Sequence, residues 1–127
     1  MGAICLFDTT GTTASVNNVL SAQSSGIAIV AGTSNCTVSD NYIADTNGEN
    51  DINTPEKGNA ILLDWNGKSD PNHLTITSNV ISSSNAVIAK SGVYSTSKTN
   101  QHNEISSNII TGYNYGVNWY ALLTCGE

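Results

Sequence analysis

The chain of 127 residues contains no arginine, and its four lysines are outnumbered by ten acidic residues, so the formal net charge is −6. Charged residues make up only 11% of the chain, against about a quarter in an average domain. An acidic chain without arginine offers phosphates few partners, so we expect no nucleic-acid binding. No apolar run approaches the roughly 18 to 20 residues that cross a membrane. We therefore expect no membrane insertion, and residues 3–7 lack the flanking regions of a signal peptide.

Cysteine is also scarce. The three cysteines are Cys5, Cys36 and Cys125. An odd number at wide, irregular spacing fits neither a disulfide framework nor a metal motif, so free thiols are expected. The segments 45–48 and 64–67 resemble calcium loops but do not complete the EF-hand pattern. No metal and no cofactor are expected.

The abundant residues are polar but uncharged: 17 Asn, 16 Ser and 14 Thr. Their side chains compete with the helix backbone for hydrogen bonds, which disfavours a helical protein. Apolar residues, many of them Ile and Val, form 39% of the chain and are regularly placed, which disfavours disorder. The composition therefore predicts an all-β protein.

A short element of one Asn, two apolar residues and one small residue recurs along the chain. Its copies begin at Asn18, Asn41, Asn79 and Asn108. A second element, Gly followed by a β-branched residue, occurs at Gly26, Gly92 and Gly116, with a looser copy at Gly58. Repeats of roughly 20 to 40 residues that contain only strands predict a solenoid. We expect each Asn to tolerate left-handed turn geometry and to bond with the others along the axis.

Over most of residues 12–120 these two elements resemble the right-handed parallel β-helix superfamily, the pectate-lyase-like fold. The resemblance implies an all-β, single-stranded right-handed parallel β-helix of about four coils. Residues 1–127 would form one domain, either a natural short domain or a fragment of a longer protein. Within the superfamily, the scarce charge and the high Asn, Ser and Thr content are most similar to bacteriophage tailspike proteins. That similarity implies a virion tail or cell-surface location, bacterial surface polysaccharide as the partner, and a parallel homotrimer.

The two apolar residues of each Asn element point to opposite faces of a strand. We expect one set to fill the core: Leu20, Ile43, Ile81 and Ile110. The other set would form an exposed apolar stripe: Val19, Tyr42, Val80 and Ile109. Such a patch is usually covered, either by a loop of the same chain or by another subunit, and the resemblance to trimeric tailspikes favours the second.

The acidic residues concentrate between the second and third Asn elements. Six of the ten lie within residues 45–70: Asp45, Glu49, Asp51, Glu56, Asp64 and Asp70. Glycoside hydrolysis needs two carboxylates about 5 to 9.5 Å apart. Asp64 is the best catalytic candidate because it ends an apolar run beside an aromatic residue, and Glu56 is its plausible partner. The alternative is that these acids are solvated turn residues.

Aromatic residues supply flat faces for stacking on sugars. The candidate substrate-binding residues are Trp65, Tyr94, Tyr113 and Tyr115, whereas Trp119 and the apolar residues after it could close the end of the core. We therefore expect a polysaccharide-recognising domain, with glycan hydrolysis if it is an enzyme. Two alternatives remain: a non-catalytic stem or carbohydrate-binding module, and a polysaccharide lyase or epimerase. The lyase is disfavoured because pectate lyases of the superfamily use an arginine base.

Overall fold

The computed structural model describes residues 2–47, 58–66, 68–85, 90–96 and 102–119. Within these ranges the chain forms thirteen β-strands and no helix. All strand pairs are parallel. The prediction of an all-β protein is confirmed for this part of the chain. A helix long and apolar enough to cross a membrane is not found among the described residues.

The strands form three sheets. The first sheet has the order β1 (Gly2–Phe7), β4 (Ser25–Val30), β7 (Ile61–Asp64), β10 (Ser91–Ser95) and β13 (Tyr115–Trp119). The second sheet contains β2 (Thr13–Ser15), β5 (Thr37–Ser39), β8 (Thr75–Thr77) and β11 (Glu104–Ser106). The third sheet contains β3 (Asn18–Leu20), β6 (Tyr42–Ala44), β9 (Val80–Ser82) and β12 (Ile109–Thr111).

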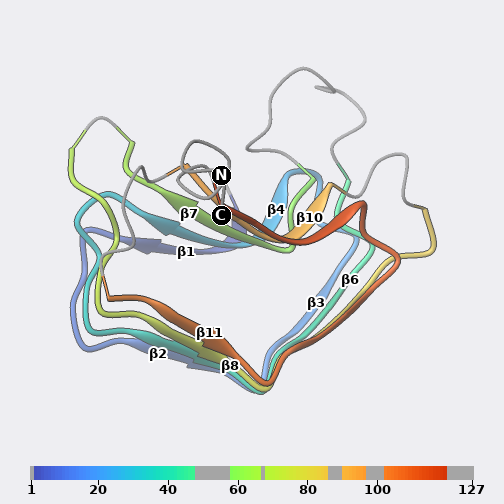
Figure 1. Cartoon of the computed structure of the whole chain (residues 1–127), viewed down its shortest axis with the longest axis horizontal. Coiled ribbons are helices and arrows are strands. Elements are labelled where there is room, and N and C mark those ends of the chain that lie inside the picture. Colours follow the sequence, from blue (N-terminus) through green and yellow to red (C-terminus); the bar gives the residue numbers. More distant parts are fainter. Residues whose placement is uncertain (1, 48–57, 67, 86–89, 97–101, 120–127) are drawn as a thin grey trace.

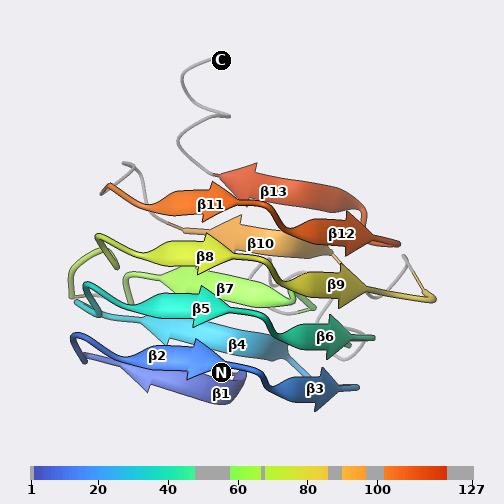
Figure 2. The ribbon, with the colours of Figure 1, turned by 90° about the horizontal axis from the view of Figure 1, so that it is seen from below.

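After β1 the chain runs through the second, third and first sheets in turn, and it does so four times. We call each such circuit a pass. Viewed along the stack, the three sheets surround a common interior (Figure 1). From the side, each pass lies on the one before it (Figure 2). Three parallel sheets visited in rotation are compatible with a parallel β-helix.

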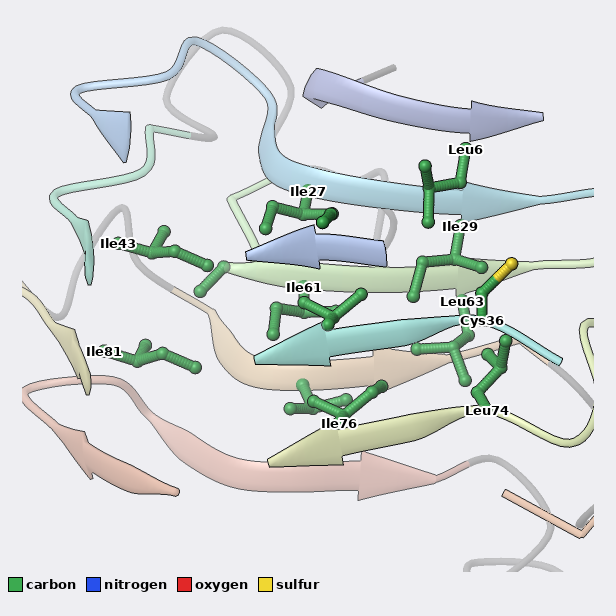
Figure 3. Close-up of a cluster of buried hydrophobic side chains, with 14 of the residues drawn as sticks. Leu6, Ile27, Ile29, Cys36, Ile43, Ile61, Leu63, Leu74, Ile76 and Ile81 are labelled. Carbon is green, nitrogen blue, oxygen red and sulfur yellow. The ribbon is translucent and has the colours of Figure 1, made fainter. Parts of the chain in front are cut away.

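The interior is filled by one apolar cluster drawn from all three sheets (Figure 3). Its largest fully buried aliphatic members are Ile27, Ile29, Ile43, Ile61, Leu63, Leu74, Ile76 and Ile81. In the last pass the equivalents are less covered, since Val117 is 45% exposed whereas its register partner Val93 is completely buried. Trp119 is 7% exposed and packs in the same cluster. The apolar residues that follow it, 120–123, lie outside the described residues.

A ladder of asparagines runs along the stack and consists of Asn17, Asn41, Asn79 and Asn108. The Oδ1 atom of Asn41, for example, accepts hydrogen bonds from the backbone N and the Nδ2 of Asn17, at 3.0 and 2.9 Å. The same pattern repeats from Asn41 to Asn79 and from Asn79 to Asn108. Bonding between asparagines along the axis is thus confirmed.

The first copy of the Asn element is displaced by one residue from its predicted position. Asn18 pairs with Tyr42 and Val19 pairs with Ile43, so the ladder residue is Asn17. Consequently Val19 is buried at 6% exposure and Leu20 is 58% exposed, the reverse of the prediction. Two consecutive asparagines made either alignment possible, and a shift of one residue exchanges the two faces of a strand.

The left-handed backbone conformation falls one residue before each ladder asparagine. Val16, Asp40, Ser78 and Ser107 have φ between 55 and 58°. The prediction that the asparagine itself takes this conformation is therefore wrong. The preceding residue makes the bend, and this leaves the asparagine side chain aligned with the stack.

Val16 is a poor residue for this position. A β-branched side chain disfavours positive φ, and Val16 is 82% exposed, so it gains no packing in return. We expect Val16→Asn to raise the free energy of unfolding by about 1 kcal/mol. Urea unfolding followed by circular dichroism measures the change. A lower midpoint for Val16→Asn would contradict the backbone conformation described at this corner.

Glycine in the second repeated element is explained by close packing. A Cβ on Gly26 would lie 2.6 Å from the Ile43 Cγ2 and 2.7 Å from the Ala60 carbonyl oxygen. Gly92 stands equally close to Ile110. In the intervening pass, Ile61 pairs with Ile27, so the equivalent of Gly26 is Ala60 rather than Gly58.

The apolar stripe is present on the outer face of the third sheet in three of the four passes. Tyr42, Val80 and Ile109 are 44%, 40% and 61% exposed. They pair in register, and Asn18 takes the corresponding place in the first pass. The prediction that Val19 belongs to this stripe is wrong, because Val19 points into the core.

Candidate functional site

The outer face of the first sheet is apolar and buried. Ala28, Val30 and Leu62 are at most 5% exposed, and they form a second cluster with Cys5 and Tyr94 packed against it. No prediction from the sequence included this cluster. The signal was present, because residues 27–31 and 60–63 are uninterrupted apolar runs rather than alternating ones, which indicates burial on both faces.

The carboxyl ends of the parallel strands in the first sheet meet at one edge, which we call the carboxyl edge. Phe7, Val30 and Asp64 occupy register positions on three adjacent strands. Thr96 follows Ser95, the register partner of Leu63, and therefore lies beside Asp64. The stacking thus assembles this edge from residues that lie far apart in the sequence.

Asp64 is the last residue of β7 and is held in place by hydrogen bonds. Its Oδ1 accepts from the Thr96 hydroxyl at 2.9 Å and from the Asn66 backbone N at 3.2 Å. The next residue, Trp65, donates its backbone N–H to Thr96 Oγ1 at 3.3 Å and leaves its side chain 48% exposed. The carboxylate is thus fixed, and the residue that follows it carries an exposed aromatic ring.

A second aromatic residue lies at the same edge. Phe7 is 45% exposed, and the Lys68 Nζ is 5.1 Å from its ring centroid. The same Nζ is 3.6 Å from the Asp8 Oδ2, although both of these side chains are more than half exposed. Pairs of that kind contribute little to stability. Together with Trp65 and Asp64, these residues give the edge two rings and charges of both signs.

Of the two carboxylates predicted for hydrolysis, the structure describes Asp64, whereas Glu56 lies outside the described residues. Asp8 is another acid at the carboxyl edge, but β4 separates its strand from β7. Two strand spacings separate the backbones of these two acids by about 10 Å. Asp8 also faces Lys68. The described residues therefore place one of the two predicted carboxylates, Asp64, at the carboxyl edge.

The other predicted aromatic residues do not join Trp65 at the carboxyl edge. Tyr94 packs on the outer cluster of the first sheet. Tyr113 is partly buried against the core, and its hydroxyl lies 2.7 Å from the Thr46 Oγ1. Tyr115 begins β13, at the opposite end of the strand, and is 59% exposed. The four aromatic residues predicted to bind substrate thus occupy four separate places.

Burial raises the pKa of Tyr113 above its ordinary value, although its hydrogen bonds with Thr46 act in the opposite direction. The unfolded chain therefore loses this proton first, so stability falls as the pH rises through about 10 and above. We expect Tyr113→Phe to lower the free energy of unfolding by about 1 kcal/mol near neutral pH. Between neutral and alkaline pH, the free energy of unfolding should fall less for this variant than for the wild type. Urea midpoints at about pH 8 and about pH 11 test this.

The matched control for this change is Tyr115→Phe, since Tyr115 lies two residues away and is exposed. It should keep the alkaline loss of the wild type. An unchanged alkaline loss in Tyr113→Phe would show that Tyr113 does not cause it.

No protein-family model, no curated protein and no solved structure matches this chain.

Proposed function

We propose that the chain is a right-handed parallel β-helix of about four coils that binds polysaccharide at the carboxyl edge of its first sheet. As part of a tailspike-like protein it would recognise bacterial surface polysaccharide. The rotation of the chain through three parallel sheets and the asparagine ladder support the fold. The low charge and the many hydroxyl and amide groups suit a ligand that is itself rich in hydroxyl groups.

The observation that carries the proposal is the exposed ring of Trp65, which follows the immobilised Asp64 at the carboxyl edge. An indole face packs on the C–H face of a sugar, and a carboxylate accepts hydrogen bonds from sugar hydroxyls. Because Thr96 and the Asn66 backbone already orient Asp64, little side-chain freedom is lost on binding. Phe7 extends the aromatic surface along the same edge.

Binding without cleavage and glycan hydrolysis are both proposed, and Asp64, held by Thr96, belongs to the site in either case. If the protein is a depolymerase, Asp64 and Glu56 are its proposed acid and base or nucleophile. Asp64→Asn distinguishes the two functions. Abolished cleavage in this variant would support hydrolysis, and a wild type that binds a glycan without cleaving it would support the binding module.

The experiment that tests the proposed site compares two aromatic truncations. Trp65→Ala should weaken binding to a polysaccharide found by screening bacterial surface glycans, by about tenfold to thirtyfold. Tyr115→Ala is the matched control because Tyr115 is also exposed but begins β13, at the opposite end of its strand from the carboxyl edge. Equal losses in both variants, or no loss in Trp65→Ala, would refute the carboxyl edge as the binding site.

A homotrimer is part of the same proposal, with the apolar stripe of Tyr42, Val80 and Ile109 as the contact surface. Three stacked apolar side chains form a continuous patch of the kind that subunits cover. Light scattering over a dilution series measures the mass. A mass of one chain at all concentrations would rule out the trimer while leaving the glycan site untouched.

A further inference from the structure

The two histidines of the chain lie in equivalent bends of consecutive passes. His73 and His102 each stand two residues before a strand of the second sheet. Gly11 and Asn35 hold the same place in the first two passes, and all four residues have φ between 51 and 68°. The backbone thus places both imidazoles in one exposed column. Their rings are stacked, with centroids 5.0 Å apart and planes inclined by 25°.

A neighbouring amide fixes the tautomer of His73. The Nδ2 of Asn72 donates to the Asp70 carbonyl at 3.2 Å, so the Asn72 Oδ1 faces the other way. This oxygen lies 2.9 Å from the His73 Nδ1. Because an amide oxygen can only accept, the Nδ1 of His73 carries a proton and donates it. In the neutral ring the lone pair is then on Nε2, an arrangement typical of histidines that bind metals.

We propose that His73 and His102 form a two-imidazole site for a borderline divalent cation such as Zn²⁺. Zinc binds imidazole nitrogen at about 2.0 to 2.1 Å. While His73 keeps its bond to Asn72, rotation of the exposed His102 ring can bring one of its nitrogens and the His73 Nε2 to a shared ion. The described residues contain no group of three or more metal-ligating side chains. Water would therefore complete the coordination, and the ion would exchange readily.

The first test is a titration of the untagged chain with Zn²⁺, followed through the imidazole NMR signals. Because the chain has only two histidines, each signal has a single source. We expect both rings to shift together and to saturate at one ion per chain. Mg²⁺ should have no effect, because it prefers oxygen ligands. The absence of saturable binding up to about 1 mM would overturn the proposal.

Substitutions then separate the imidazole pair from other ligands, including the thiols. His73→Asn and His102→Asn should fold, since Asn35 already adopts this backbone conformation in the same column. Each should weaken Zn²⁺ binding by about a hundredfold, because the second contact is lost. Asn35→His should strengthen binding by placing a third imidazole next to His73. Wild-type affinity in either single variant would show that the ion binds elsewhere.

Discussion

Replacing Asn79 with alanine is expected to lower the free energy of unfolding by about 3 to 5 kcal/mol. Asn79 is completely buried, and its Oδ1 accepts two hydrogen bonds from Asn41. Its Nδ2 donates to the Val38 carbonyl at 3.0 Å and to the Asn108 Oδ1 at 2.9 Å. Alanine leaves the buried donors of Asn41 and the buried Val38 carbonyl without these bonds, whereas the Asn108 Oδ1 keeps its bond from the backbone N of residue 79. For a domain stabilised by about 5 to 15 kcal/mol, the variant would be at the margin of folding, as urea unfolding should show.

The controls for this variant come from the first pass. Asn17 lies at the end of the ladder and donates only toward Asn41, so Asn17→Ala should have a smaller effect than Asn79→Ala. Asn18 is exposed on β3, so Asn18→Ala should stay within about 0.5 kcal/mol of the wild type. A large loss in Asn18→Ala, with none in Asn17→Ala, would mean that the first pass has the register that the sequence pattern predicts.

Ile81→Ala is expected to cost about 3 kcal/mol, because Ile81 is completely buried in the interior cluster. The preceding residue on β9, Val80, is 40% exposed on the outer face. Val80→Ala should therefore cost less than about 1 kcal/mol in a monomer. Urea unfolding at one low protein concentration measures both variants. Similar losses in the two would contradict the alternation of inward and outward residues on this strand.

Much of the fold could be predicted from the sequence, because stacked passes repeat their chemistry. Ladder positions need an amide that both donates and accepts, and this requirement is visible at Asn41, Asn79 and Asn108. The register of the first pass was predicted wrongly because Asn17 and Asn18 both fit the pattern. Ala14 could have decided between the two alignments. It pairs with Val38, and each of these two buried apolar residues lies three positions before a ladder asparagine.

The candidate site was harder to predict than the fold. Asp64 and Trp65 are adjacent in the sequence and could be proposed from it, whereas Phe7 and Thr96 reach the same edge only through stacking. Successive ladder asparagines are 24, 38 and 29 residues apart. With spacing this irregular, sequence separation does not predict which side chains become neighbours. The His73–His102 pair was missed for the same reason.

The stacking register can be measured directly by NMR, through contacts between inward methyl groups of successive passes. The structure predicts cross-relaxation from Val19 to Ile43, from Ile43 to Ile81 and from Ile81 to Ile110, because these residues are register partners on strands about 4.8 Å apart. Contacts from Leu20 to Ile43 in place of Val19, or the absence of contacts between Ile43 and Ile81, would contradict the stack of parallel passes.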